Sequence, residues 1–209
     1  TFSATREFRP HNNGRIMIGL GLMLMSLKLI SEATVPLREA SLFHAVLTAI
    51  GHEPLLAFIT GAVLAWAFHS TLAVILLIAS FVANGSLELG GALAFILGLN
   101  LGGGLPAISS TLALPPAGRR LPVANLACRS IAALIGLAFI QRITGWAALL
   151  PFDAVTVALA FHAALNLVIG LFFLPLTKLV ENQVIKLVPD VKLDADQLAA
   201  PARHAQQAG

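Results

Sequence analysis

Charged side chains are scarce in this sequence of 209 residues, since only 11% of them are Asp, Glu, Lys or Arg. A soluble domain carries about 25% charged residues, so this chain has too few to cover a surface that faces water. Three stretches without a formal charge each exceed the roughly 20 residues that cross the hydrocarbon core of a bilayer: 54–87, 89–118 and 154–177. The alternating segments of about ten residues that mark a transmembrane barrel are missing. The composition therefore predicts an all-α, polytopic bundle of transmembrane helices.

Cysteine is nearly absent as well, and the single Cys128 excludes an internal disulfide. We expect it to be a buried, unreactive thiol. No secretory signal is visible, because residues 1–15 are polar, and the chain begins with Thr1 rather than Met, so we expect a fragment. The net charge of +3 comes from basic residues at segment ends, as in juxtamembrane loops, which argues against a nucleic-acid partner. We expect a multi-pass protein of the cell inner (plasma) membrane.

Catalytic motifs and intramembrane carboxylates are missing too. The sequence contains no GxSxG, HExxH or Walker pattern, and the adjacent His69 and Ser70 point apart on a helix, so they supply no nucleophile–base pair. We therefore predict no enzyme and no cofactor. The carboxylates nearest to the predicted spans lie at their ends, namely Glu32, Glu53, Glu88 and Asp153. Proton-coupled transporters use intramembrane Asp, Glu or His, so Na⁺ held by neutral oxygens is the easier interpretation of a coupling ion.

Residues 54–84 are too long for one crossing. As one straight helix they would run roughly 46 Å, whereas the hydrocarbon core is about 30 Å thick. Split at His69–Ser70, each half would run roughly 22–24 Å, which favours a re-entrant hairpin whose tip reaches the bilayer interior. A strongly tilted single helix is the alternative. With a hairpin, three basic clusters share one side of the membrane, as the positive-inside tendency requires; they lie before the first span, at Arg119–Arg120, and after the last span.

The other segments complete a membrane domain of residues 15–178, flanked by polar segments at 1–14 and 179–209. Glycines, Asn100 and Pro106 crowd the segment after the hairpin, so we predict a helix to about Leu99, an unwound turn, and a second short helix. The remaining expectations are a first span at 15–37, an amphipathic interfacial helix at 38–54, a loop at 115–122, a span at 123–140, a connector at 141–153 and a last span at 154–176.

The predicted hairpin tip offers two half-helix ends to a ligand. The second half would expose free N–H groups near Ser70 and Thr71, which suit an anion. The first half would expose carbonyls near Phe68, which suit a hard cation such as Na⁺. The hydroxyls of Ser70 and Thr71 can donate or coordinate, and His69 could reinforce either role. The alternative is structural, because Ser and Thr often bond the carbonyl four residues earlier and a lone His is often an interhelical contact.

Two stretches carry a resemblance to a known family. They are "FITGAVLAWAFHSTLAVILLIASFVANG" (58–85) and "ALAFILGLNLGGGLPA" (92–107), and together they resemble the type II sodium–phosphate cotransporters in their bacterial branch. "HSTLA" (69–73) takes the place of that family's QSSSA motif, and "GLNLGGG" (98–104) that of its GANIGTT motif. His69 replaces the Gln, Leu72 the third Ser, and Gly103–Gly104 the Thr pair. "AFHAALNLVIGLFFLPL" (160–176) resembles a later H-x-x-x-N segment.

The resemblance implies Na⁺-coupled transport of inorganic phosphate by alternating access, with this chain as one repeat of a larger transporter. It implies the other inverted repeat or a second copy as a partner, and "TKLVENQVIKLVPD" (177–190) as the start of a PhoU-like region. The alternative is a non-transporting membrane scaffold or regulatory subunit. The implied substrate-binding residues are His69, Ser70, Thr71, Asn100, Gly102, Gly103 and Gly104, and weaker candidates for the ion or substrate are Phe68, Asn125, His162 and Asn166.

Overall fold

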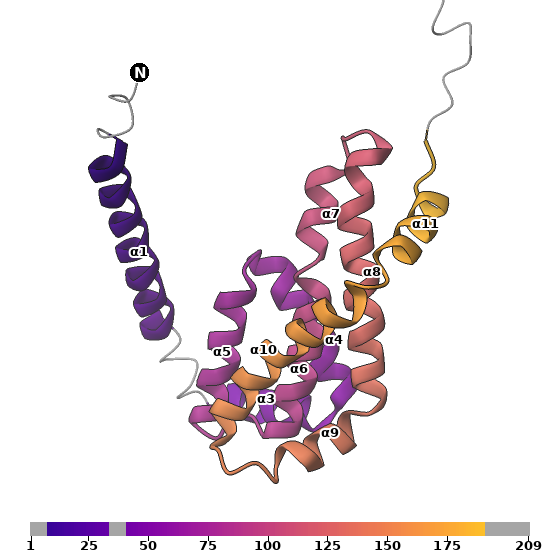
Figure 1. The fold of residues 1–209 in the computed structure, drawn as a ribbon. Helices are drawn as coiled ribbons and strands as arrows, with labels where there is room; N and C mark the ends of the chain where they lie inside the picture. Colours follow the sequence, from indigo (N-terminus) through magenta and orange to yellow (C-terminus); the bar gives the residue numbers. More distant parts are fainter. Residues whose placement is uncertain (1–7, 34–40, 191–209) are drawn as a thin grey trace, which may run out of the picture.

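The computed structural model describes residues 8–33 and 41–190 (Figure 1). Within these ranges the chain is helical and forms no strand, which confirms the all-α prediction. The helices are α1 (Phe8–Ala33), α3 (Ser41–His52), α4 (Pro54–Phe68), α5 (Thr71–Ala83), α6 (Leu89–Gly102), α7 (Leu105–Thr111), α8 (Pro116–Ala138), α9 (Ile140–Ala147), α10 (Ala154–Phe173) and α11 (Thr177–Leu187).

The chain breaks at His69–Ser70, as the length argument predicts. Helix α4 ends at Phe68 because His69 adopts a left-handed backbone, with φ 52° and ψ 20°. Ser70 then starts α5 as its N-cap, and its side-chain oxygen accepts a hydrogen bond from the Ala73 N–H at 3.2 Å. A capped second start directly after a left-handed residue allows the chain to reverse.

Contacts along α6 show that α4 and α5 form a hairpin. At one end of α6, the Leu87 side chain lies against Gly51 and Gly91. Further along, Thr71 lies against Gly103. The hairpin therefore enters and leaves at the Gly51–Leu87 end, and its tip lies beside the interior of the span that α6 begins (Figure 1). The alternative of one tilted helix is excluded.

Helix α6 is the centre of the bundle, and glycine lets α4 approach it at backbone distance. A Cβ atom on Gly98 would overlap the Phe58 carbonyl, one on Gly102 would overlap that of Ala62, and one on Gly61 would overlap that of Phe95. Membrane helices pack this closely through small residues spaced four apart. Several of these glycines therefore serve packing rather than unwinding.

The predicted order of a helix, a break and a second short helix is confirmed, but the break comes later than Leu99 for that reason. Helix α6 continues to Gly102, and the break at Gly103 and Gly104 keeps right-handed values, with φ −65° and ψ −13° at the first and φ −83° and ψ −21° at the second. Helices α6 and α7 together form one apolar span over Leu89–Thr111. The break interrupts the helix without turning the chain out of the bundle.

Two predicted connections are helical instead. The loop expected at 115–122 was wrong, because α8 begins at Pro116, where a proline without an N–H costs nothing, and continues past Pro122 in its second turn. Part of the connector expected at 141–153 lies in α9. Helix α10 then starts at Asp153, whose carboxylate accepts hydrogen bonds from the Thr156 side chain and N–H; these bonds lower the pKa of Asp153.

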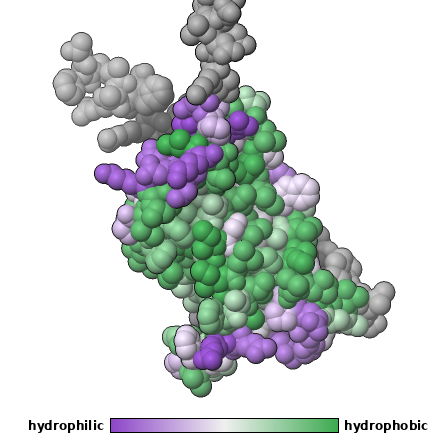
Figure 2. All heavy atoms as spheres, turned by 90° about the vertical axis from the view of Figure 1, so that its right-hand side faces the viewer, coloured by the Kyte–Doolittle hydropathy of each residue, from purple (hydrophilic) through white to green (hydrophobic). Residues whose placement is uncertain are grey.

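Three helical stretches in the described part of the chain are long and apolar enough to cross a membrane: Leu89–Thr111, Pro116–Ala138 and Ala154–Phe173. Helices α3 and α4, which meet at a bend of 114°, are together apolar enough for a broken span or a re-entrant loop; the contacts of Leu87 and Thr71 described above favour re-entry. An apolar belt separates polar atoms at the two ends of the molecule (Figure 2). The chain is therefore a multi-pass membrane protein.

The remaining segment predictions have mixed outcomes. The span expected at 15–37 is helical in α1 as far as Ala33, and its apolar part, Gly14–Ser26, is shorter than the three spans. Residues 34–37 lie outside the described residues, as do 1–7 and 191–209 of the two polar segments. The described parts of those segments contribute to α1 and α11. Cys128 is a buried free cysteine, as expected.

Candidate functional site

At the hairpin tip, the carbonyl end of α4 meets the N–H end of α5. Hydrogen bonds within the tip occupy some of its polar groups. The His69 side chain is exposed, and its Nδ1 lies 3.2 Å from the Ala67 carbonyl oxygen. The Ser70 hydroxyl oxygen caps α5. The Thr71 hydroxyl makes no hydrogen bond to another described residue, so it is free to meet a ligand. A left-handed His is uncommon and is typical of constrained turns and ligand sites.

The α6–α7 junction lies between this tip and α8. A Cβ atom on Gly103 would press on the Thr71 methyl group. A Cβ atom on Gly104 would lie 3.0 Å from Leu126 and 3.7 Å from the Arg129 side chain, both on α8. The absence of side chains at this junction lets both the hairpin tip and α8 approach it closely.

Arg129 lies beside this junction, in the middle of α8, and two of its nitrogens are held by asparagines. Its Nη1 donates to the Asn100 side-chain oxygen at 2.7 Å and to the Asn100 carbonyl at 3.1 Å. Its Nε donates to the Asn125 side-chain oxygen at 3.2 Å. Its Nη2 makes no hydrogen bond to a described residue. The guanidinium is therefore fixed in direction with one nitrogen still available.

Two further polar atoms in this region have no partner. Asn100 is fully buried on α6, and its Nδ2, which can only donate, makes no hydrogen bond within the described residues. His162 also has a buried Nδ1 without a partner among the described residues, and it lies on α10, which packs against both α6 and α8. We call Asn100, Arg129, Asn125 and His162 the Arg129 cluster.

No carboxylate neutralises this cluster in the described part of the chain. The ion pairs found there are Lys28–Glu32 and Arg120–Asp190, both at the ends of helices. The same residues contain no group of three or more His, Cys, Asp or Glu side chains that could hold a metal ion. A charge inside a membrane is costly and marks a substrate or ion pathway by default. A guanidinium with unpaired donors around it suits an oxyanion, which accepts several charge-assisted hydrogen bonds.

Sequence reasoning did not select Arg129 as a site residue. With a loop predicted up to Pro122, Arg129 stood near the start of a span, where a basic residue is ordinary. With α8 beginning at Pro116, the same residue is near the middle of a span that ends at Ala138. The signal was present in Pro116, because proline is favoured at the first position of a helix; Pro122, which lies inside α8, gave no such signal.

The other residues predicted for the site do not all lie together in the structure. Thr71, Gly103 and Gly104 lie together at the junction, and Asn100 and Asn125 join them through Arg129. Gly102 packs against α4. The Phe68 and His69 side chains are exposed at the tip. The Asn166 amide donates to the His162 carbonyl at 2.8 Å, a bond within α10.

Comparison with known proteins gives a consistent family. The family model described as Na⁺/Pi-cotransporter matches residues 38–182. The chain is 32% identical over 174 residues to the "Putative inorganic phosphate export protein YjbB" of Escherichia coli (strain K12), covering 83% of this chain and 32% of that protein. It is 26% identical over 188 residues to the uncharacterized protein YqeW of Bacillus subtilis (strain 168), covering 90% of this chain and 61% of that protein.

The chain thus spans about a third of the length of the YjbB protein it matches. The equally named protein of Salmonella typhimurium (strain LT2) is 30% identical over 189 residues, covering 90% of this chain and 35% of its own length. No solved structure matches the chain significantly.

Proposed function

The chain belongs to the Na⁺/Pi-cotransporter family, and on this premise we propose that it binds inorganic phosphate at the Arg129 cluster and takes part in moving it across the membrane. The observation that carries the proposal is Arg129 itself, a mid-span cation held by Asn100 and Asn125 with no carboxylate partner among the described residues. The family description and the names of the YjbB relatives, which refer to inorganic phosphate export, support phosphate as the anion. They also favour a transporter over an enzyme.

The geometry supports a specific mode of binding. Arg129 Nη2 would donate to one phosphate oxygen, while Nη1 and Nε keep the guanidinium oriented through the two asparagines. Asn100 Nδ2 and His162 Nδ1 would donate to others, the histidine in the tautomer that carries its proton on Nδ1. The Gly103–Gly104 backbone would allow the anion to approach closely. Phosphate would thereby satisfy buried donors that otherwise lose hydrogen bonds, each at a cost of about 1–3 kcal/mol.

Na⁺ would bind at the hairpin tip rather than in the Arg129 cluster. The carbonyl end of α4 at Phe68 and the Thr71 hydroxyl offer neutral oxygens. A cation there would lie beside Gly103, whereas the arginine lies beside Gly104, so bound phosphate would have positive charge near it from two elements. This arrangement makes each ion favour the binding of the other, which is what coupling requires.

The proposed setting is the inner (plasma) membrane, and the proposed machine is larger than this chain. Because the chain spans about a third of its YjbB relatives, a second inverted repeat or a second copy would supply the rest of the pathway. The non-transporting scaffold remains the competing function, and it predicts no ligand at Arg129.

Phosphate binding to the purified chain in detergent tests the proposal. Binding of radiolabelled phosphate is measured in NaCl and in choline chloride for the parent, Arg129→Gln and Arg142→Gln. Arg142 is an exposed arginine on α9 and provides a matched loss of charge. Losing a hydrogen bond to a charged ligand costs about 1.5–3 kcal/mol, so Arg129→Gln should weaken binding roughly 10- to 150-fold and Arg142→Gln should not. Equal binding by all three proteins would favour the scaffold.

A further inference from the structure

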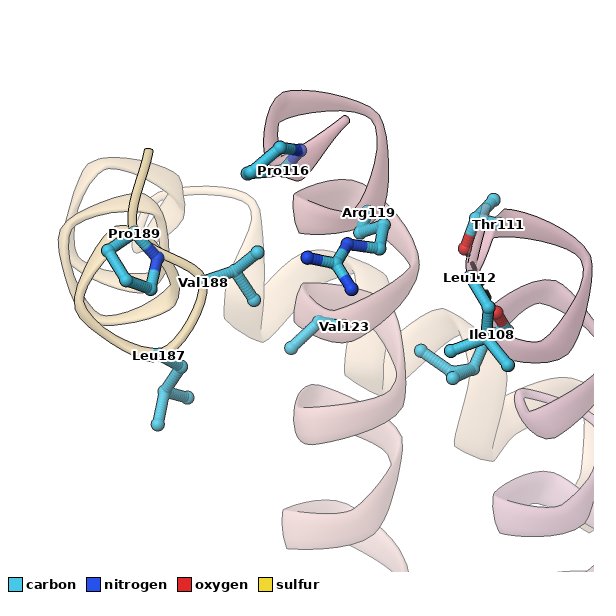
Figure 3. A pocket seen from close by; sticks show the side chains of 9 residues that line it. All are labelled: Ile108, Thr111, Leu112, Pro116, Arg119, Val123, Leu187, Val188 and Pro189. Atoms are coloured by element: carbon cyan, nitrogen blue, oxygen red, sulfur yellow. Dashed lines mark hydrogen bonds between the residues drawn. The ribbon is translucent and has the colours of Figure 1, made fainter. Parts of the chain in front are cut away.

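Another arginine, Arg119, has no hydrogen-bond partner among the described residues and lies at the start of α8, far from the Arg129 cluster along the helix. A cavity of about 310 Å³ opens between the ends of α7 and α11 and the start of α8. Pockets that bind small molecules start near this size, at about 300 Å³. Its lining residues are Ile108, Thr111, Leu112, Pro116, Arg119, Val123, Leu187, Val188 and Pro189 (Figure 3).

Arg119 is the charged residue of this lining. Its guanidinium lies between Ile108 and Leu112 on one side and Val188 on the other (Figure 3). Its Nε is buried and has no hydrogen-bond partner within the described residues. A buried charged donor without a partner points to a missing ion, water or ligand.

The neighbouring arginine shows the contrast. Arg120 Nη2 lies 2.8 Å from the Asp190 carboxylate, an ion pair whose geometry is not that of a hydrogen bond, and Arg120 Nε donates to the Val188 carbonyl at 3.1 Å. The Asp190 carboxylate thus pairs with Arg120, and no acidic side chain of the described residues lines the cavity. Of the two adjacent positive charges, Arg119 is the one left to attract an anion.

The rest of the wall selects the kind of anion. Apart from Arg119 and the Thr111 hydroxyl, which donates to carbonyls of its own helix, the lining is apolar. A free inorganic anion would lose its hydration against such walls. An amphiphile would place its anionic group on Arg119 and its glycerol and first methylenes on Ile108, Leu112 and Val123. Val123 lies about one helical turn further into the span than Arg119, in the direction an acyl chain would take.

We propose that this cavity binds the phosphate group of an anionic phospholipid, with Arg119 as its ligand. Basic pockets between membrane helices hold such headgroups where cationic residues gather at the bilayer surface. Because Leu187, Val188 and Pro189 complete the cavity, the bound lipid would also hold the end of α11 against α8. The proposal goes beyond phosphate transport and does not depend on Arg129, so either can fail without the other.

Native mass spectrometry of the purified chain, titrated with phosphatidylglycerol or phosphatidylcholine, tests the site. Arg119→Gln should raise the dissociation constant for phosphatidylglycerol about tenfold, the lower limit for one lost hydrogen bond to a charged group. Arg142→Gln, the matched charge loss on α9, should change it less than about twofold, as expected for a distant, screened charge. Size-exclusion chromatography and thermal unfolding check that each variant is folded.

A second variant separates the apolar wall from the charge. Leu112→Trp narrows the cavity at an exposed position without touching an arginine, and it should weaken phosphatidylglycerol binding while the protein stays folded. Three results would overturn the proposal: equal losses in Arg119→Gln and Arg142→Gln, equal affinity for phosphatidylcholine, or displacement of the lipid by millimolar inorganic phosphate. The last result would make the cavity a site for the free ion.

Discussion

One hydroxyl at the hairpin tip can distinguish ligand binding from packing. The Thr71 methyl group lies against Gly103, while its hydroxyl has no hydrogen-bond partner among the described residues. Thr71→Val keeps the shape and removes the hydroxyl. We expect almost unchanged thermal stability and, if Na⁺ or phosphate uses this oxygen, an apparent affinity lower by roughly 10- to 150-fold, from about 1.5–3 kcal/mol per lost bond. Phosphate binding against Na⁺ concentration measures it, and an unchanged curve would assign Thr71 to packing alone.

The neighbouring Ser70 cannot distinguish ligand binding from a structural role in the same way. Its side-chain oxygen caps α5, so Ser70→Ala removes a structural hydrogen bond as well as any contact with a ligand. Loss of an N-cap costs roughly 1 kcal/mol. We expect Ser70→Ala to lower the unfolding temperature and Ser70→Asp, which can still cap, to restore it. If Ser70→Ala unfolds like the parent, the cap contributes nothing to stability.

Packing of α4 on α6 should depend on glycine at chosen positions. A methyl group at Gly98 would overlap the Phe58 carbonyl, whereas one at Gly170 on α10 would meet nothing within 4 Å. Gly98→Ala should therefore destabilise the protein by about 1–3 kcal/mol through overpacking. Gly170→Ala should be neutral or stabilising by up to about 1 kcal/mol, because alanine is the better helix former. Thermal unfolding in detergent compares the two, and equal effects would contradict the close approach.

The α4–α5 hairpin makes a topological prediction. Glu53 and Glu88 flank it and are both exposed, and the Leu87 contact with Gly51 places its two ends together. In a Cys128→Ala background, Glu53→Cys and Glu88→Cys should react with a membrane-impermeant maleimide from the same side. Ala113→Cys, in the connection between α7 and α8, should react from the other side. Labelling of positions 53 and 88 from opposite sides would rule out re-entry.

The sequence predicts a structural element correctly where a physical rule allows only one structure. Length against bilayer thickness required a break in residues 54–84, and the polar triplet at His69–Thr71 was the place where it occurs. The prediction was wrong where one residue type can play two structural roles. Gly98 and Gly102 were interpreted as helix breakers, yet they allow α4 and α6 to pack closely. Pro116 and Pro122 were interpreted as part of a loop, yet they lie in the first two turns of α8. Asn100, Asn125 and His162 were named from the sequence, but Arg129 and the grouping of the four were missed, because no spacing along the chain brings α6, α8 and α10 together.

The assembled transporter should depend on Na⁺ rather than on protons. The long spans Leu89–Thr111, Pro116–Ala138 and Ala154–Phe173 contain no carboxylate, so they offer no acidic proton carrier. We expect phosphate movement in vesicles that contain the full-length protein to stop in choline and to survive collapse of the proton gradient. Flux in choline driven equally well by a pH gradient would assign the coupling to protons, with His162 as the first residue to examine.

The parallel contact between α4 and α6 also limits how such a molecule can move. At Gly61, Gly98 and Gly102, a backbone carbonyl of one helix fills the space that a side chain would take on the other. The two helices therefore cannot slide along each other unless their backbones first separate. These two helices should therefore travel as one rigid body. The bonds from Arg129 to Asn100 cross from that body to α8, so they tie α8 to the rigid pair. An anion held on Arg129 Nη2, as proposed above, would leave these bonds in place and would move with both parts, so any movement that releases it should involve other elements than α4, α6 and α8.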